Sequence, residues 1–137
     1  MENPIVCRNR HSVYVLEYHL VVVTKYRHPV LQGPLKDRLI ELSYKLLTEG
    51  TYDCEILSIN TDLDHVHILF RTAPQVQLSK LVNTYKTVTA RHIRKEFAKE
   101  LQAYYQKPVF WSSSYFVATV SERTRNAVDE YIKKQGG

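Results

Sequence analysis

Hydrophobic periodicity along this chain switches repeatedly between the two-residue period of a strand and the 3.6-residue period of a helix. The segment Val13–Thr24 is rich in β-branched and aromatic residues and alternates as a strand does. The next segment, Pro34–Glu49, carries leucines at helical spacing and is followed by Gly50, a residue typical of helix ends. The first third of the chain therefore predicts a strand followed by a helix.

The same reading continues to the end of the sequence. Two alternating segments joined by a turn-like link, Tyr52–Asn60 and His65–Arg71, predict a β-hairpin. A long basic helix is expected over Leu78–Tyr105, then a strand over Val109–Val120, and a last helix from Ser121 to Gln135.

This order, β-α-β-β-α-β-α, predicts an α+β fold of the ferredoxin-like, split βαβ kind. We expect an antiparallel sheet with helices on one face and one added C-terminal helix. No repeat or linker divides the chain, so residues 1–137 are expected to form one domain. A chain of this length buries about two-thirds of its unfolded surface, enough for a core without metal or disulfide.

Composition narrows the class of protein, its cellular compartment and the kind of partner it can bind. The chain is 44% hydrophobic and 24% charged, and it has neither an apolar run of membrane-spanning length nor a signal-like N-terminus. Its two cysteines, Cys7 and Cys54, form no metal or disulfide pattern, which favours a cytoplasmic protein. The net charge of +5 and the pI near 9.2 permit a polyanionic partner without proving one.

His65 and His67 are one residue apart within a predicted strand, so both imidazoles leave the same face of the sheet. Such a pair can hold one metal ion, and it can equally be two polar residues on a solvated face. A zinc hydrolase of the HxHxDH type is excluded, because Leu69 and Phe70 stand where that motif needs Asp and His.

Tyr131 and Gln135 are spaced i, i+4 and lie on one face of the last predicted helix. Tyr131 fits an apolar stripe with its helical neighbours, whereas Gln135 does not. An amide oxygen is a good ligand for a hard metal, so two imidazoles and one amide leave open positions on a divalent ion for a phosphate oxygen and water. In that arrangement the phenol of Tyr131 is a nucleophile.

Four segments together resemble a known family. They are YHLVVVTKYRHPVL (18–31), LDHVHILF (63–70), WSSSYFVATVSE (111–122) and YIKKQ (131–135). In this order they are similar to the single-tyrosine HUH transposases of small bacterial and archaeal insertion sequences, the superfamily that includes the REP-associated tyrosine transposases. The resemblance spans nearly the whole chain.

The resemblance implies a DNA transposase that binds DNA hairpins at the ends of its element, then cuts and rejoins single-stranded DNA. By position, Tyr131 matches the family's nucleophile, His65 and His67 its metal-binding pair, and Gln135 its third metal ligand. The implied cofactor is Mg²⁺ or Mn²⁺. A 5′-phosphotyrosine intermediate stores the energy of the broken bond, so no nucleotide cofactor is needed.

Further contacts follow less directly. Asp64 either accepts a proton from one of the two imidazoles or simply belongs to the turn. Six basic residues are candidate phosphate ligands near Tyr26 and Tyr85, with a solvated helix face as the alternative reading: Lys25, Arg27, Lys86, Arg91, Arg94 and Lys95.

The family pattern also implies a homodimer in which the tyrosine helix of one subunit completes the histidine site of the other. No glycine lies in the joint Ala118–Arg123 before that helix, where some relatives have glycines, so a large swing of the helix is less assured here. Two other functions stay open: a domesticated nucleic-acid-binding protein without transposition activity, and a phosphoesterase that activates water and leaves Tyr131 without a role.

Overall fold

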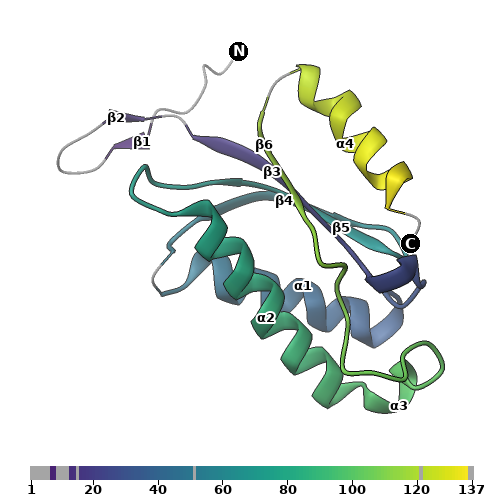
Figure 1. The fold of residues 1–137 in the computed structure, drawn as a ribbon. Coiled ribbons are helices and arrows are strands. Elements are labelled where there is room, and N and C mark those ends of the chain that lie inside the picture. The colour runs from purple at the N-terminus through teal and green to yellow at the C-terminus, as the bar shows by residue number, and fades with distance from the viewer. Residues whose placement is uncertain (1–6, 9–12, 15, 51, 121, 136–137) are drawn as a thin grey trace.

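A computed structural model describes residues 7–8, 13–14, 16–50, 52–120 and 122–135. Four strands form an antiparallel sheet in the order β4-β5-β3-β6, with bounds Glu55–Thr61 (β4), His65–Arg71 (β5), Glu17–Val23 (β3) and Phe116–Thr119 (β6). Helices α1 (Gly33–Thr48) and α2 (Leu78–Glu96) cover one face, and α4 (Glu122–Lys134) lies over the other (Figure 1). The predicted ferredoxin-like α+β fold with an added C-terminal helix is confirmed.

The remaining elements are short. Strands β1 (Cys7–Arg8) and β2 (Val13–Tyr14) pair with each other in a separate two-stranded sheet. A 3₁₀ turn, η1 (Lys25–Arg27), follows β3, and a four-residue helix, α3 (Ala98–Leu101), follows α2.

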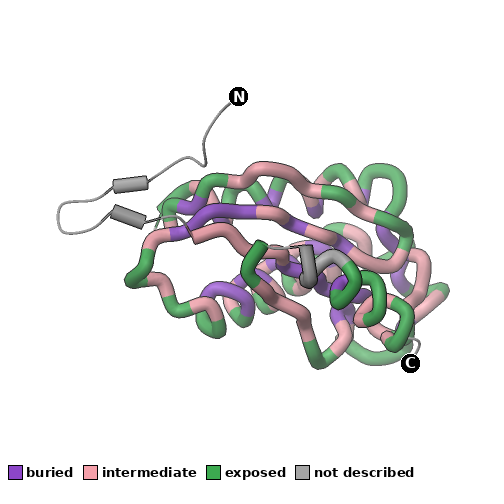
Figure 2. The backbone as a smooth tube through the Cα atoms, turned by 90° about the horizontal axis from the view of Figure 1, so that it is seen from above, coloured by how far each residue is buried: buried purple, intermediate pink, exposed green. Residues whose placement is uncertain are grey.

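Strand β3 is covered on both of its faces. Leu20 and Val22 are fully buried in the main core beneath α1 and α2. Val21 and Val23 are equally buried but point to the other face, where they pack with Val128 of α4. Figure 2 shows buried stretches along the strands in the middle of the molecule and exposed residues around its edge. The sheet thus carries a large core on one face and a small apolar contact with α4 on the other.

Two predicted strands are longer than the observed ones. The segment Val13–Thr24 divides because β2 pairs with β1, whereas β3 pairs with β5 and β6. The segment Val109–Val120 is a strand only at Phe116–Thr119, with an isolated bridge from Trp111 to Thr24. Between these two pairings, the Ser112 and Ser114 carbonyls accept hydrogen bonds from the Lys86 ammonium and not from the backbone of a neighbouring strand.

The predicted helix Leu78–Tyr105 is also interrupted. Phe97 leaves the helical conformation with φ −123° and ψ 36°, so that α2 ends at Glu96 and α3 begins a new direction. This bend lets Leu101 enter the main core and lets the Tyr105 hydroxyl donate a hydrogen bond to the Lys25 carbonyl at 2.8 Å. Tertiary packing therefore overrides helix propensity at this point.

Candidate active site

Strand β5 presents His65 and His67 to the face of the sheet that α4 covers. Their neighbours Val66 and Ile68 are fully buried on the opposite face, as the alternation of a strand requires. In the ladder, His65 lies opposite Val23 and His67 opposite Val21. Both of those valines pack with α4, so the two imidazoles lie beside that contact.

His65 is held by a chain of polar contacts. Its Nδ1 lies 2.9 Å from Asp64 Oδ1, and Arg27 Nε donates to Asp64 Oδ2 at 2.8 Å. Burial acts to raise the pKa of the Asp64 carboxyl, but the hydrogen bonds from His65 and Arg27 outweigh it and lower that pKa. An ionised Asp64 accepts the Nδ1 proton and leaves the Nε2 lone pair of His65 free to bind a metal.

His67 contacts a third histidine from β3. Its Nε2 lies 2.7 Å from His19 Nδ1, and the two ring centres are 4.9 Å apart. Burial lowers the pKa of His67, and the nearby His19 and His65 lower it further, while Asp129 of α4 acts in the opposite direction. The pKa shift favours the neutral imidazole, which is the form that binds a metal.

Tyr131 lies in α4 and Gln135 directly follows the end of that helix, and both side chains reach the segment before β6. The Tyr131 hydroxyl lies 2.8 Å from Ser114 Oγ, and its ring packs on Phe116 with centres 5.6 Å apart. Gln135 Oε1 accepts hydrogen bonds from Ser112 and Ser114, each at 3.3 Å. Burial raises the pKa of the Tyr131 phenol, and the bond to Ser114 offsets part of that rise.

Lys86 positions these serines from the other side. Its ammonium donates to the Ser112 carbonyl at 2.8 Å and to the Ser114 carbonyl at 3.5 Å. Burial lowers the pKa of Lys86, and the neighbouring charge of Lys25 lowers it further. The structure therefore places Lys86 as an anchor of the segment 112–115, and its role as a phosphate ligand stays a prediction.

The histidine pair and the tyrosine helix meet at one end of the sheet. The Ser112 amide donates to the Val23 carbonyl at 2.7 Å, and Val23 lies opposite His65. Thr24, the residue that follows β3, donates its amide to the Asp64 carbonyl at 2.9 Å. Val23 and Thr24 thus connect the serines that hold Gln135 with the residues that hold His65, and the C-terminal end of α4 lies at this end (Figure 1).

His65, His67 and Gln135 are donors that suit a divalent metal, although the structure does not bring these three side chains together. Among the described residues, no three His, Cys, Asp or Glu side chains lie close enough together to hold an ion. His65 and His67 therefore need a donor of another kind, and an amide oxygen such as that of Gln135 is a suitable one. In this arrangement, that oxygen contacts Ser112 and Ser114.

The other predicted contacts separate into two groups. Arg91, Arg94 and Lys95 line an open groove at the end of α2, and Arg94 also bonds to the Pro108 carbonyl. Lys25 and Arg27 belong to η1 beside Asp64. Tyr85, which lies beside Lys86 in the sequence, is only 1% exposed, and its hydroxyl bonds to Ser43 at 2.8 Å, so it belongs to the core face of α2.

Three side chains of this region were not predicted as site residues: His19, Ser112 and Ser114. The signal for His19 is its place on the same strand face as Val21 and Val23, which the alternation of the first strand indicates. Ser112 and Ser114 lie two residues apart within the predicted strand Val109–Val120, and in a strand that spacing sends both side chains to one side. Their contact with Tyr131 and Gln135 depends on tertiary packing and has no sequence signal.

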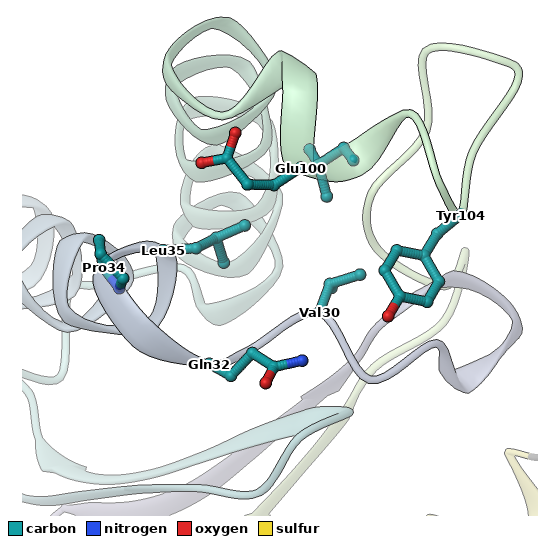
Figure 3. Close-up of a pocket in the computed structure, with 7 residues that line it drawn as sticks. Val30, Gln32, Pro34, Leu35, Glu100 and Tyr104 are labelled. Carbon is teal, nitrogen blue, oxygen red and sulfur yellow. The ribbon is translucent and has the colours of Figure 1, made fainter.

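A separate pocket of about 180 Å³ lies away from these residues. Figure 3 shows Val30 and Gln32 ahead of α1, Leu35 in its first turn, and Glu100 and Tyr104 from the α3 region around it. None of the predicted site residues lines this pocket.

None of the helices in the described part of the chain is both long and apolar enough to cross a membrane.

Comparison with known proteins gives consistent matches. The family model described as "Transposase IS200 like" matches residues 12–135. The ISDra2 transposase TnpA of Deinococcus radiodurans is 33% identical over 128 residues, which cover 93% of this chain and 89% of that protein. The transposase for insertion sequence element IS200 of Salmonella typhimurium is 28% identical over 125 residues, covering 91% and 80%.

Solved structures agree with these sequence matches. A crystal structure of a candidate transposase from Deinococcus radiodurans superposes with a TM-score of 0.85 at 34% identity, covering 94% of this chain and 97% of that one. A REP-associated tyrosine transposase bound to a REP hairpin has a TM-score of 0.51 at 14% identity, covering 97% and 76%. At that identity the second likeness concerns the fold alone.

Proposed function

Because this chain belongs to the family of IS200-like transposases, we propose that it cuts and rejoins single-stranded DNA through a 5′-phosphotyrosine intermediate formed by Tyr131. The observation that carries the proposal is the position of Tyr131 and Gln135. Tyr131 in the last turns of α4 and Gln135 just after it bond to neighbouring serines, at the end of the sheet where β5 presents His65 and His67. A nucleophile, two imidazoles and an amide oxygen are the groups that this reaction needs.

The chemical step is a displacement at phosphorus. The Tyr131 phenolic oxygen forms a bond to the scissile phosphorus, and the bond from phosphorus to the 3′ oxygen breaks with its electron pair on that oxygen. The phenol loses one proton and the leaving oxygen gains one, which yields a free 3′-hydroxyl and a phosphotyrosine at the 5′ end. Reversal with a different 3′-hydroxyl rejoins the strand without a nucleotide cofactor.

The phenol has to be activated for this step. An ordinary tyrosine has a pKa of about 10, and burial raises that of Tyr131, so the hydroxyl is protonated at neutral pH. The hydrogen bond to Ser114 opposes the rise and fixes the direction of the hydroxyl. We infer that Ser114 orients Tyr131 for attack.

We propose that His65, His67 and Gln135 hold a divalent ion, Mg²⁺ or Mn²⁺. The ion, when bound there, supplies positive charge for the non-bridging oxygens of the scissile phosphate. Asp64 fixes the ring of His65, and its bond to Arg27 ties η1 to the same site. Gln135 reaches the imidazoles by exchanging its serine partners for them, either within its own subunit or in a partner.

We further propose that DNA hairpins are the recognised ends of the substrate and that the working form is a homodimer. A transposase of the same fold binds a REP hairpin, which supports the first of these proposals. The positive net charge of +5 and the basic residues at the end of α2 supply attraction for phosphates.

The direct test is substitution of the nucleophile. Tyr131→Phe removes only the phenolic oxygen, so we expect cleavage of hairpin-containing single-stranded DNA to be lost while hairpin binding stays within a few-fold of wild type. Tyr44→Phe, at an exposed tyrosine of α1, is the matched control and is expected to retain full activity. A covalent adduct formed by the Tyr131→Phe protein overturns the assignment.

A further inference from the structure

A second pocket, lined mainly by aromatic side chains, lies beside the turn η1. We name it the aromatic pocket; it has a volume of about 260 Å³ and is lined by Tyr26, His28, Tyr104, Tyr105 and Lys107, among others. One water molecule occupies about 30 Å³ in the liquid, so this volume has room for a planar ring. The proposed chemistry at Tyr131 makes no use of this pocket.

The rings of the aromatic pocket are arranged around His28. Its ring centre lies 5.3 Å from that of Tyr104 and 5.3 Å from that of Tyr105, and 5.8 Å from that of Tyr26. Tyr105 is only 8% exposed and is fixed by its bond to the Lys25 carbonyl, whereas Tyr26 is 54% exposed. The pocket thus has a fixed inner wall and an outer wall that reaches into solvent.

The backbone keeps Tyr26 in that exposed position at a conformational cost. Tyr26 and Arg27 have φ values of 59° and 54°, in the left-handed region that residues other than glycine rarely adopt. The Arg27 amide donates to the Thr24 carbonyl, and the Arg27 side chain bonds to Asp64 at 2.8 Å. One strained turn therefore directs Arg27 to the histidine site and Tyr26 to the aromatic pocket. Backbone strain of this kind is typical of functional positions.

The pocket continues into a positively charged surface. A neighbouring cavity of about 440 Å³, which we name the basic groove, is lined by Arg91, Arg94, Lys95 and Lys107. Lys107 and Tyr105 line both cavities, so the pocket and the groove are contiguous. The pocket of Figure 3 shares Tyr104 but carries the carboxylate of Glu100, which repels phosphate.

We propose that the aromatic pocket takes up one unstacked base of single-stranded DNA, while neighbouring phosphates of that strand lie along the basic groove. Aromatic rings accept any base by stacking, and basic side chains follow the charged backbone. The turn η1 then joins this base site directly to Asp64 and His65. This inference rests on the proposed function, because it assigns a contact to the DNA strand that Tyr131 cuts.

The test compares two probes that differ only in their bases. One is a 12-nucleotide oligothymidylate, and the other is a 12-unit abasic deoxyribose phosphate polymer with the same charge. We expect the wild-type protein to bind the oligothymidylate more tightly by roughly 5- to 150-fold, the range for stacking of one base. Tyr26→Ala and Tyr104→Leu are expected to lose most of this preference while binding the abasic polymer as the wild type does.

Three further variants complete the experiment. Tyr26→Phe keeps the ring and is expected to keep the preference, and Tyr44→Ala, at an exposed tyrosine elsewhere, is expected to change nothing. Lys107→Gln is expected to weaken binding of both polymers about equally. If the preference for oligothymidylate survives both Tyr26→Ala and Tyr104→Leu, the base site is wrong. Adduct formation at Tyr131 does not depend on that outcome and stays intact. Wild-type protein that binds neither polymer contradicts the proposed function as well.

Discussion

At the scale of single residues, the candidate site depends on which nitrogen of each histidine carries its proton. The Asp64 carboxylate lies between two donors, His65 Nδ1 at 2.9 Å and Arg27 Nε at 2.8 Å. This pairing fixes the His65 ring and directs its Nε2 lone pair away from Asp64. His67 Nε2 instead lies 2.7 Å from His19 Nδ1, so the orientation of the His67 ring depends on a residue from another strand.

Asp64→Asn tests this positioning role. His65 and Arg27 contact different oxygens of Asp64, and asparagine replaces one of these oxygens with an NH₂ donor, so one of the two bonds is lost. We expect the affinity for Mn²⁺, measured by calorimetric titration without DNA, to fall by about 10- to 100-fold. Asp37→Asn, at an exposed carboxylate of α1, is the control. Unchanged Mn²⁺ affinity in the Asp64 variant contradicts the role given to this carboxylate.

At the scale of elements, the segment 112–115 connects the sheet to α4. Lys86 of α2 anchors it through two carbonyls, Ser112 joins it to β3, and the serine hydroxyls hold Tyr131 and Gln135. The position of the nucleophile thus depends on an amine that comes from the opposite side of the sheet. A change at Lys86 should therefore affect catalysis more than DNA binding.

Lys86→Met removes the ammonium and keeps the length of the side chain. We expect DNA cleavage to fall by at least about tenfold, because loss of a charged hydrogen bond costs roughly 1.5–3 kcal/mol. The salt dependence of DNA binding should stay as in wild type. Lys80→Met, at an exposed lysine of the same helix, serves as the control. If the slope of log affinity against log salt concentration falls by about one unit, and cleavage falls only as much as DNA binding does, Lys86 contacts a phosphate instead.

The sequence predicts the elements more fully than their ends. Alternation identifies β5 with its observed bounds, and leucine spacing places α1 to within a residue. The break at Phe97 and the non-strand segment 112–115 escape prediction because long-range contacts cause both: the burial of Leu101 and the Lys86 anchor. Likewise, spacing pairs Tyr131 with Gln135, but the serines that hold them become visible only in the fold.

At the scale of the whole molecule, α4 is attached to its own sheet by a small contact. Val128 packs on Val21 and Val23, with Tyr131 and Ile132 partly buried beside them. In this position Gln135 bonds to serines of its own chain. In the homodimer proposed above, the sheet face of the second subunit offers the same valines and the same imidazoles, and we propose that the helix completes the site of that partner.

Mixing two inactive variants distinguishes the arrangements. A heterodimer of a Tyr131→Phe subunit and a His67→Ala subunit contains one complete site if the helix acts in the partner, and none if it acts within its own subunit. We expect cleavage to recover to a fraction of the wild-type rate, measured with heterodimers purified through two different tags. Heterodimers that form but do not cleave contradict assembly across the dimer.

The central claim, covalent attack by Tyr131, is tested most directly by labelling each end of one substrate in turn. Single-stranded DNA from the flanks of the gene that encodes this chain is incubated with protein and Mg²⁺, denatured, and analysed by gel and by mass spectrometry of peptides. We predict that the 3′-labelled fragment stays attached to the protein at Tyr131 and that the 5′-labelled fragment is released with a 3′-hydroxyl. Attachment of the 5′-labelled fragment, attachment at another residue, or cleavage without any adduct contradicts the mechanism.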